Sequence, residues 1–156
     1  MVKITFPDGS IREYPLGVTG IEIARSISER LAAEVLSITV NGEVWDLTRG
    51  ITTDATVKLH KWDDEEGKHT FWHTSAHLMA QALEALYPGI KLGIGPSIDN
   101  GFYYDIDFDS YTISDDDFPK IEQKMAELAH QKLDVVRKDV SKDEALATYK
   151  AKGDPY

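Results

Sequence analysis

The stretch that decides the fold of the first sixty residues spans residues 36–47 and is centred on Val40-Asn41-Gly42-Glu43. Asn41-Gly42 separates a run of strand-forming residues, 36–40, from a second run, 43–47. A type I′ turn needs positive φ at both central residues, and Asn-Gly meets that need with little strain. The stretch therefore predicts a tight β-hairpin.

The same signals recur on both sides of this hairpin. Residues 2–6 alternate apolar and polar side chains, the turn Pro7-Asp8-Gly9-Ser10 follows, and residues 11–14 return as a second strand. A further strand is expected at residues 55–60.

A helix is expected between the two hairpins. Thr19 and Glu22 have the spacing of a capping box, and Ile23, Ile27 and Leu31 recur at helical spacing and are expected to face inward. The order of hairpin, helix, hairpin and strand predicts an α+β fold in which one helix crosses a small mixed sheet. A ubiquitin-like β-grasp domain has this layout, and we expect it over residues 1–61.

A charged segment without apolar periodicity, residues 62–68, is interpreted as a linker to a second α+β domain at residues 69–156. That domain is expected to begin with a helix at 70–87, ended by Pro88-Gly89, and to contain strands at 102–108 and 134–140. Two more helices are expected, each capped by a serine. The first follows Ser114 and has an inner stripe of Phe118, Ile121, Met125 and Leu128, and the second runs from Ser141 to Gly153. The chain ends on a turn signal, residues 154–156, so we expect this domain to be truncated.

The composition excludes several classes of protein. The chain has no cysteine and therefore no disulfide framework, and neither a signal peptide nor an apolar stretch of membrane-spanning length is evident, so a cytoplasmic location without membrane contact is expected. The formal net charge of -10 argues against binding nucleic acid by phosphate neutralisation alone. Seven Asp residues between 99 and 117 are interpreted as a solvated acidic face, in part at a helix N-terminus.

The main candidate for chemistry is the pair His73 and His77. Four residues apart on a helix, the two imidazoles are neighbours, and both lie off the apolar stripe. They are either an exposed surface pair or part of a pocket where they position and deprotonate water. Thr74 stands where a metalloprotease would have glutamate, and no further ligand has suitable spacing, so no metal site is expected within this chain.

A second candidate is the aromatic strand Phe102-Tyr103-Tyr104, preceded by the loop glycines Gly93 and Gly95. The default interpretation is core packing and ordinary loop flexibility. The alternative is a pocket face at which bare backbone approaches a ligand closely.

Together these motifs resemble a known family. Pro7-Asp8-Gly9-Ser10 and Val40-Asn41-Gly42-Glu43 resemble a TGS domain, which occurs in threonyl-tRNA synthetases, in certain GTPases and in stringent-response nucleotide synthetases. The His73-x-x-x-His77 pair and the run from Ile94 to Asp105 are similar to the editing domain of bacterial threonyl-tRNA synthetases, a domain type shared with alanyl-tRNA synthetases. The resemblance spans the whole chain.

The resemblance implies a proofreading role. The family joins threonine to its tRNA with ATP, and its editing domain hydrolyses serine mischarged onto that tRNA. It implies that His73 and His77 are catalytic, with His73 activating water and His77 supporting it near the terminal adenosine. Gly95 and Tyr104 would bind substrate.

The resemblance also sets limits. The family's editing pocket includes a lysine and an Asp-x-Cys-x-x-x-His segment that lie beyond residue 156. ATP, magnesium and zinc are expected only for the aminoacylation core, and none of these cofactors for this fragment. The fragment alone is expected to be inactive and monomeric, whereas the parent enzyme would be a homodimer that binds threonine tRNA. Two alternatives stay open: a freestanding TGS module that binds RNA or protein without catalysis, and a metal-dependent hydrolase completed by another chain.

Overall fold

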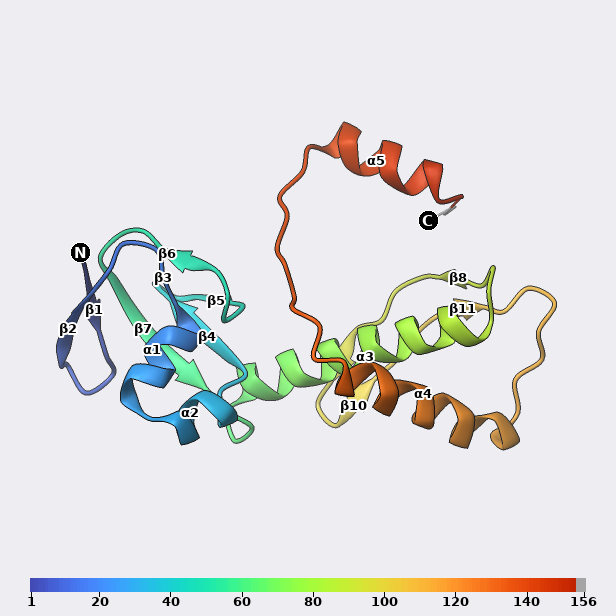
Figure 1. The fold of residues 1–156 in the computed structure, drawn as a ribbon, viewed down its shortest axis with the longest axis horizontal. Helices are drawn as coiled ribbons and strands as arrows, with labels where there is room; N and C mark the ends of the chain where they lie inside the picture. Colours follow the sequence, from blue (N-terminus) through green and yellow to red (C-terminus); the bar gives the residue numbers. More distant parts are fainter. Residues whose placement is uncertain (154–156) are drawn as a thin grey trace. The chain divides into compact units, whose positions relative to one another are not determined.

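In the computed structural model, which describes residues 1–153, a five-stranded mixed sheet organises the first part of the chain (Figure 1). Its strand order is β2-β1-β7-β4-β5, and β1 and β7 are parallel whereas the other neighbours are antiparallel. The strands are β1 (Val2–Thr5), β2 (Ile11–Tyr14), β4 (Ser37–Val40), β5 (Glu43–Trp45) and β7 (Ala55–His60). The short strands β3 (Val18–Thr19) and β6 (Gly50–Ile51) form a separate ladder. The predicted β-grasp layout is confirmed.

Two local predictions in this unit are confirmed. Asn41 and Gly42 have φ values of 50° and 89°, as a type I′ turn requires. The capping box is present, because the Thr19 hydroxyl accepts a hydrogen bond from the Glu22 amide while the Glu22 carboxylate accepts one from the Thr19 amide.

The helix predicted after Thr19 is two helices rather than one. α1 (Gly20–Ile27) ends at Ser28, whose hydroxyl accepts a hydrogen bond from the Leu31 amide and so begins α2 (Glu29–Glu34). Because the chain turns at Ser28, the inward stripe is interrupted. Ile23 is fully buried, but Ile27 is 43% exposed, and its predicted inward position is wrong.

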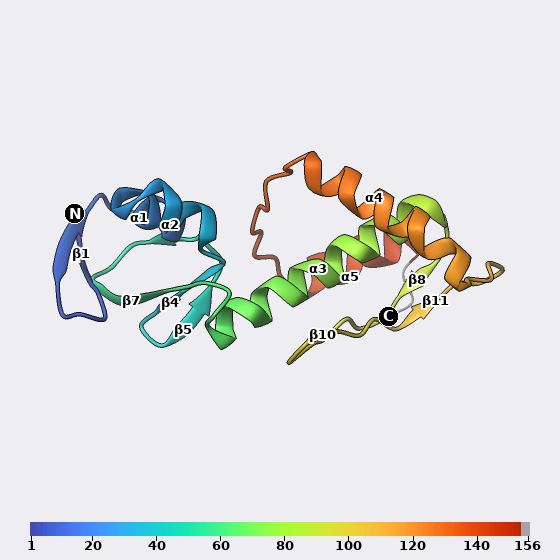
Figure 2. The ribbon, with the colours of Figure 1, turned by 90° about the horizontal axis from the view of Figure 1, so that it is seen from below.

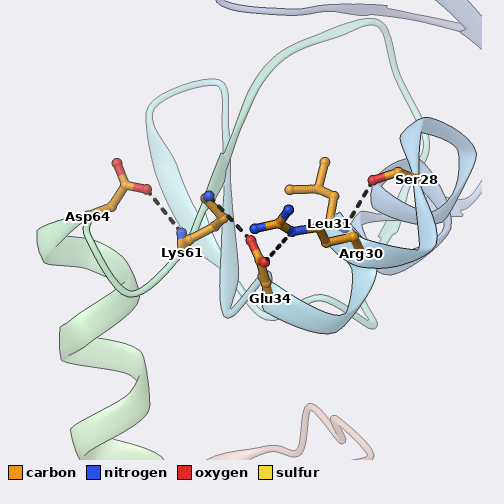
Figure 3. A network of polar contacts seen from close by, with 6 residues as sticks. All are labelled: Ser28, Arg30, Leu31, Glu34, Lys61 and Asp64. Carbon is orange, nitrogen blue, oxygen red and sulfur yellow. Dashed lines mark hydrogen bonds and ion pairs between the residues drawn. The ribbon is translucent and has the colours of Figure 1, made fainter.

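The core of this unit lies between the sheet and α1, which Figure 2 shows with α2 on one side of the sheet. Its buried residues are Val2, Ile4, Val18, Ile23, Ile38, Val40, Ile51, Ala55 and Val57. At the end of α2, Glu34 accepts hydrogen bonds from Arg30 and Lys61, and this network ties α2 to the turn after β7 (Figure 3).

The long helix α3 (Glu65–Leu86) begins five residues before the predicted helix. Four of the seven residues interpreted as a linker, residues 65–68, therefore form its first turn. The chain divides into two compact units between Phe71 and Trp72, inside this helix.

The second unit packs α3 against α4 (Phe118–His130) and two short ladders. One ladder pairs β8 (Lys91–Leu92) with β11 (Ile106–Asp107), and the other pairs β9 (Ser97–Ile98) with β10 (Gly101–Phe102). The predicted strand 102–108 is thus two short strands joined by residues 103–105, whose backbone still bonds to residues 93–96. The predicted alternation is nevertheless confirmed, because Phe102, Tyr104, Ile106 and Phe108 are partly buried and the residues between them are exposed.

Three further differences concern the end of the chain. Ser114 caps a 3-10 turn, η1 (Asp115–Asp117), rather than α4 itself, and Phe118 is 51% exposed rather than inward. Residues 134–140 are exposed and form no strand, since no strand among residues 1–153 lies beside them to accept their hydrogen bonds. The prediction for α5 (Lys142–Ala151) is confirmed, with Ser141 as its cap. The turn expected at residues 154–156 lies outside the described residues.

None of the described helices combines the length and the apolar character needed to cross a membrane.

Candidate editing site

The paired histidines lie on consecutive turns of α3, on the face that the sequence predicts to be free of the apolar stripe. Their Nε2 atoms are 3.2 Å apart, and the two rings are nearly perpendicular, at 88°. Two imidazole nitrogens at this distance share one hydrogen bond only if one carries a proton and the other offers a lone pair. The contact is therefore a hydrogen bond whose donor depends on the tautomers of the two rings.

The electrostatics favour a neutral ring at one of these positions. The pKa of His77 is lowered below the ordinary value for histidine, first by partial burial and second by the charge of His73. At neutral pH the His77 imidazole is therefore uncharged. A neutral imidazole that is held in a hydrogen bond to a second one can relay or accept a proton.

Gly95 and Tyr104 lie opposite each other on two segments of chain that run side by side. The amide of Tyr103 donates to the carbonyl of Pro96 at 3.1 Å, and the amide of Asp105 donates to the carbonyl of Ile94 at 3.0 Å. These bonds bracket Gly95 and Tyr104, and a Cβ at position 95 would overlap the Tyr104 ring. Gly95 therefore provides the space in which the tyrosine ring lies.

Tyr104 is also electrostatically coupled to α3. Its pKa is raised above the ordinary value for tyrosine, first by burial and second by the negative charge of Glu84. Glu84 lies seven residues after His77, which is two helical turns along the same face. The phenol thus remains protonated at neutral pH, as a hydrogen-bond donor beside the helix that carries the histidines.

The predicted site residues therefore form two direct contacts, His73 with His77 and Gly95 with Tyr104. Glu84 links the second contact to the histidine-bearing helix, and it was not predicted as a site residue. Its position seven residues after His77, on the same face of the helix, is the sequence signal that could have identified it. Ala80, between His77 and Glu84 on this face, is only 4% exposed, whereas the side chains of His73, His77 and Glu84 are exposed.

The opposite side of α3 borders an apolar cavity of about 500 Å³, which the sequence did not indicate. Met79 and Leu83 of α3, Phe102 and Phe108 of the aromatic segment, and α4 line this cavity. Glu122 is the one ionisable residue among its lining residues. The cavity therefore lacks the side chains needed for hydrolysis, and the histidine face is the better candidate site.

Comparison with known proteins gives a consistent result for both units. Residues 2–61 match the family described as TGS domain. Over all 156 residues, the chain is 60% identical to the threonine--tRNA ligases of Parabacteroides distasonis and Cytophaga hutchinsonii, and 59% identical to that of Bacteroides fragilis. The chain covers 24% of the length of each of these relatives.

Proposed function

Because this chain belongs to the threonine--tRNA ligase family over the quarter of its relatives' length that it spans, we propose that it is the proofreading part of such an enzyme. The complete protein would attach threonine to its tRNA with ATP and magnesium, and with zinc in the aminoacylation core. This region of the protein would hydrolyse the ester of serine that has been attached in error to the threonine tRNA. The observation that carries the proposal is the 3.2 Å contact between the Nε2 atoms of His73 and His77.

The need for such a site follows from the two amino acids. Serine lacks one methyl group of threonine, and a missing methyl or methylene in a binding pocket is worth only about 10–200-fold in discrimination. A synthetic site alone would therefore charge serine at an appreciable rate. A second site that accepts serine and hydrolyses its ester corrects this error.

The proposed reaction is hydrolysis of the ester bond between serine and the terminal ribose. Water attacks the carbonyl carbon while a neutral imidazole of the histidine pair accepts its proton. The tetrahedral intermediate then collapses, the bond to the ribose oxygen breaks, and the imidazolium returns the proton to that oxygen. The products are free serine and uncharged tRNA.

Each site residue has a proposed role in this scheme. His73 orients and activates the water, and His77, which its lowered pKa keeps neutral, shares the proton with His73 near the terminal adenosine. Tyr104 donates a hydrogen bond to the substrate, since its raised pKa keeps the hydroxyl protonated. Gly95 keeps the Tyr104 ring in place.

The test is a deacylation assay whose substrate is threonine tRNA carrying serine. It is run on the 156-residue chain and on the full-length protein that contains it. We expect hydrolysis by the full-length protein only, and a loss of about 10²–10⁴-fold in rate on His73→Ala, the usual contribution of a general base. His130→Ala is the matched control, because His130 is an exposed histidine on α4 whose ring bonds the Ala126 carbonyl. Full-length protein that leaves seryl-tRNA intact, or a His73→Ala variant at the full rate, would contradict the proposal.

A further inference from the structure

A second cluster of ligand-bearing side chains lies in the first unit, where β7 meets α3. His60 is the last residue of β7, Asp64 lies in the turn that follows, and Glu66 is in the first turn of α3. One ligand atom from each of these side chains lies within 4.8 Å of the other two. An imidazole and two carboxylates at this separation match the donor set of a divalent transition metal ion.

The turn that brings them together is well defined. The Lys61 amide donates to Asp64 Oδ2 at 3.0 Å, and the Asp64 amide donates to the Lys61 carbonyl at 3.1 Å. Gly67 is buried against that same carbonyl, and a Cβ at position 67 would overlap it. The Lys61 side chain also bonds Glu34 of α2, which fixes the turn from outside (Figure 3).

His60 is the observation that points to a ligand. Its side chain is fully buried, yet its Nδ1 has no hydrogen-bond partner among the described residues. Its other ring nitrogen, Nε2, lies 2.6 Å from the Thr39 hydroxyl. Metal-bound histidines usually have the second nitrogen hydrogen-bonded to an oxygen in this way, which orients the free nitrogen toward the metal.

The charges around Nδ1 also suit a cation. Glu66 Oε2 lies 3.5 Å from Nδ1, too far for a good hydrogen bond, and Asp64 Oδ2 accepts a hydrogen bond from the Lys61 amide at 3.0 Å. Lys58 Nζ lies 3.0 Å from Asp64 Oδ1, and so one of the two negative charges is compensated. The Lys58 side chain is 52% exposed, so this ion pair lies at the surface.

We propose that His60 Nδ1, Asp64 and Glu66 bind one divalent transition metal ion, with Zn²⁺ as the best fit, and that water completes its coordination. Zn²⁺ accepts nitrogen and carboxylate ligands in a four-coordinate arrangement. A bound ion would join the end of β7 to the start of α3 and stabilise the first unit. This site is separate from the paired histidines, and no part of the proposal depends on editing activity.

The test is titration of the 156-residue chain with Zn²⁺ alone, followed by calorimetry and by the ¹⁵N shifts of the histidine rings. The His73→Gln/His77→Gln variant serves as the background, because the paired imidazoles would otherwise compete for the ion. We expect one bound equivalent, a shift of His60 Nδ1 rather than Nε2, and a higher Tm with Zn²⁺ than without it.

Variants of the carboxylates separate the site from adventitious binding, since replacing the buried His60 would also disturb folding. Glu66→Gln and Asp64→Asn should each weaken Zn²⁺ binding by about tenfold or more. Glu65→Gln, an exposed carboxylate on the same helical turn, should leave it unchanged. Absence of binding at millimolar Zn²⁺, equal affinity of the Glu66→Gln variant, or a shift confined to other histidines would overturn the proposal.

Discussion

The ring of Tyr104 lies directly over the Cα of Gly95, and the space between them is too small for a Cβ. The hydrogen bonds from Tyr103 to Pro96 and from Asp105 to Ile94 hold the two residues opposite each other. Glycine is thus required at position 95 to make room for a neighbouring side chain.

Gly95→Ala should destabilise the second unit by about 1–3 kcal/mol, the usual cost of inserting a methyl group into a packed site. In the Tyr104→Ala background the same substitution should be nearly neutral, because the ring that it meets is gone. Denaturant unfolding of the four proteins of this double-mutant cycle measures the coupling. Equal costs in both backgrounds would mean that the ring and the glycine do not constrain each other.

The titration of His77 should respond to its neighbour. Because the charge of His73 is the second cause of the lowered His77 pKa, His73→Asn should raise that pKa. The rise should be incomplete, since partial burial is the larger cause and remains. NMR titration of the His77 ring measures both effects. His130→Asn should leave the His77 pKa unchanged, and a His77 pKa that falls on His73→Asn would contradict the assigned causes.

The capping box of α1 should make folding sensitive to acid. The Thr19 amide and then the Thr19 hydroxyl lower the pKa of Glu22 from its ordinary value of 4.5. A carboxyl group whose folded pKa is depressed contributes stability that is complete above its unfolded pKa and is lost as pH falls through its folded pKa. Wild-type protein should therefore lose more stability than Glu22→Gln between neutral pH and pH values below 4.5.

Denaturant unfolding at several pH values measures this difference, and Glu13→Gln, an exposed carboxyl on β2, is the control. At neutral pH, Thr19→Ala should cost about 1 kcal/mol through loss of the cap. Parallel pH profiles for wild type and Glu22→Gln would show that the carboxylate does not support the helix.

Shortening a side chain to alanine should cost more stability on α3 than at the start of α4 in the second unit. Leu83 on α3 is 3% exposed, and Leu83→Ala should cost about 2–5 kcal/mol. Phe118 is 51% exposed at the start of α4, and Phe118→Ala should cost much less although more atoms are removed. Urea unfolding compares the two, and a larger loss for Phe118→Ala would mean that the phenylalanine is buried in solution.

Features that depend on neighbours in sequence were predictable. The Asn41-Gly42 turn, the Thr19–Glu22 capping box and the Ser141 cap each need only a few consecutive residues, so their chemistry is complete in the local sequence. The contact between His73 and His77 is of the same kind, because residues four apart on any helix are neighbours.

Features that depend on distant partners were decided by the tertiary structure. Residues 134–140 have strand-forming side chains but no strand beside them among the described residues, and backbone groups without such a partner form no ladder. The position of Tyr104 over Gly95, and the burial of His60 beside Glu66, arise only when separate segments fold together. The sequence by itself therefore determined which residues carry the chemistry, and the tertiary structure decided which of them meet.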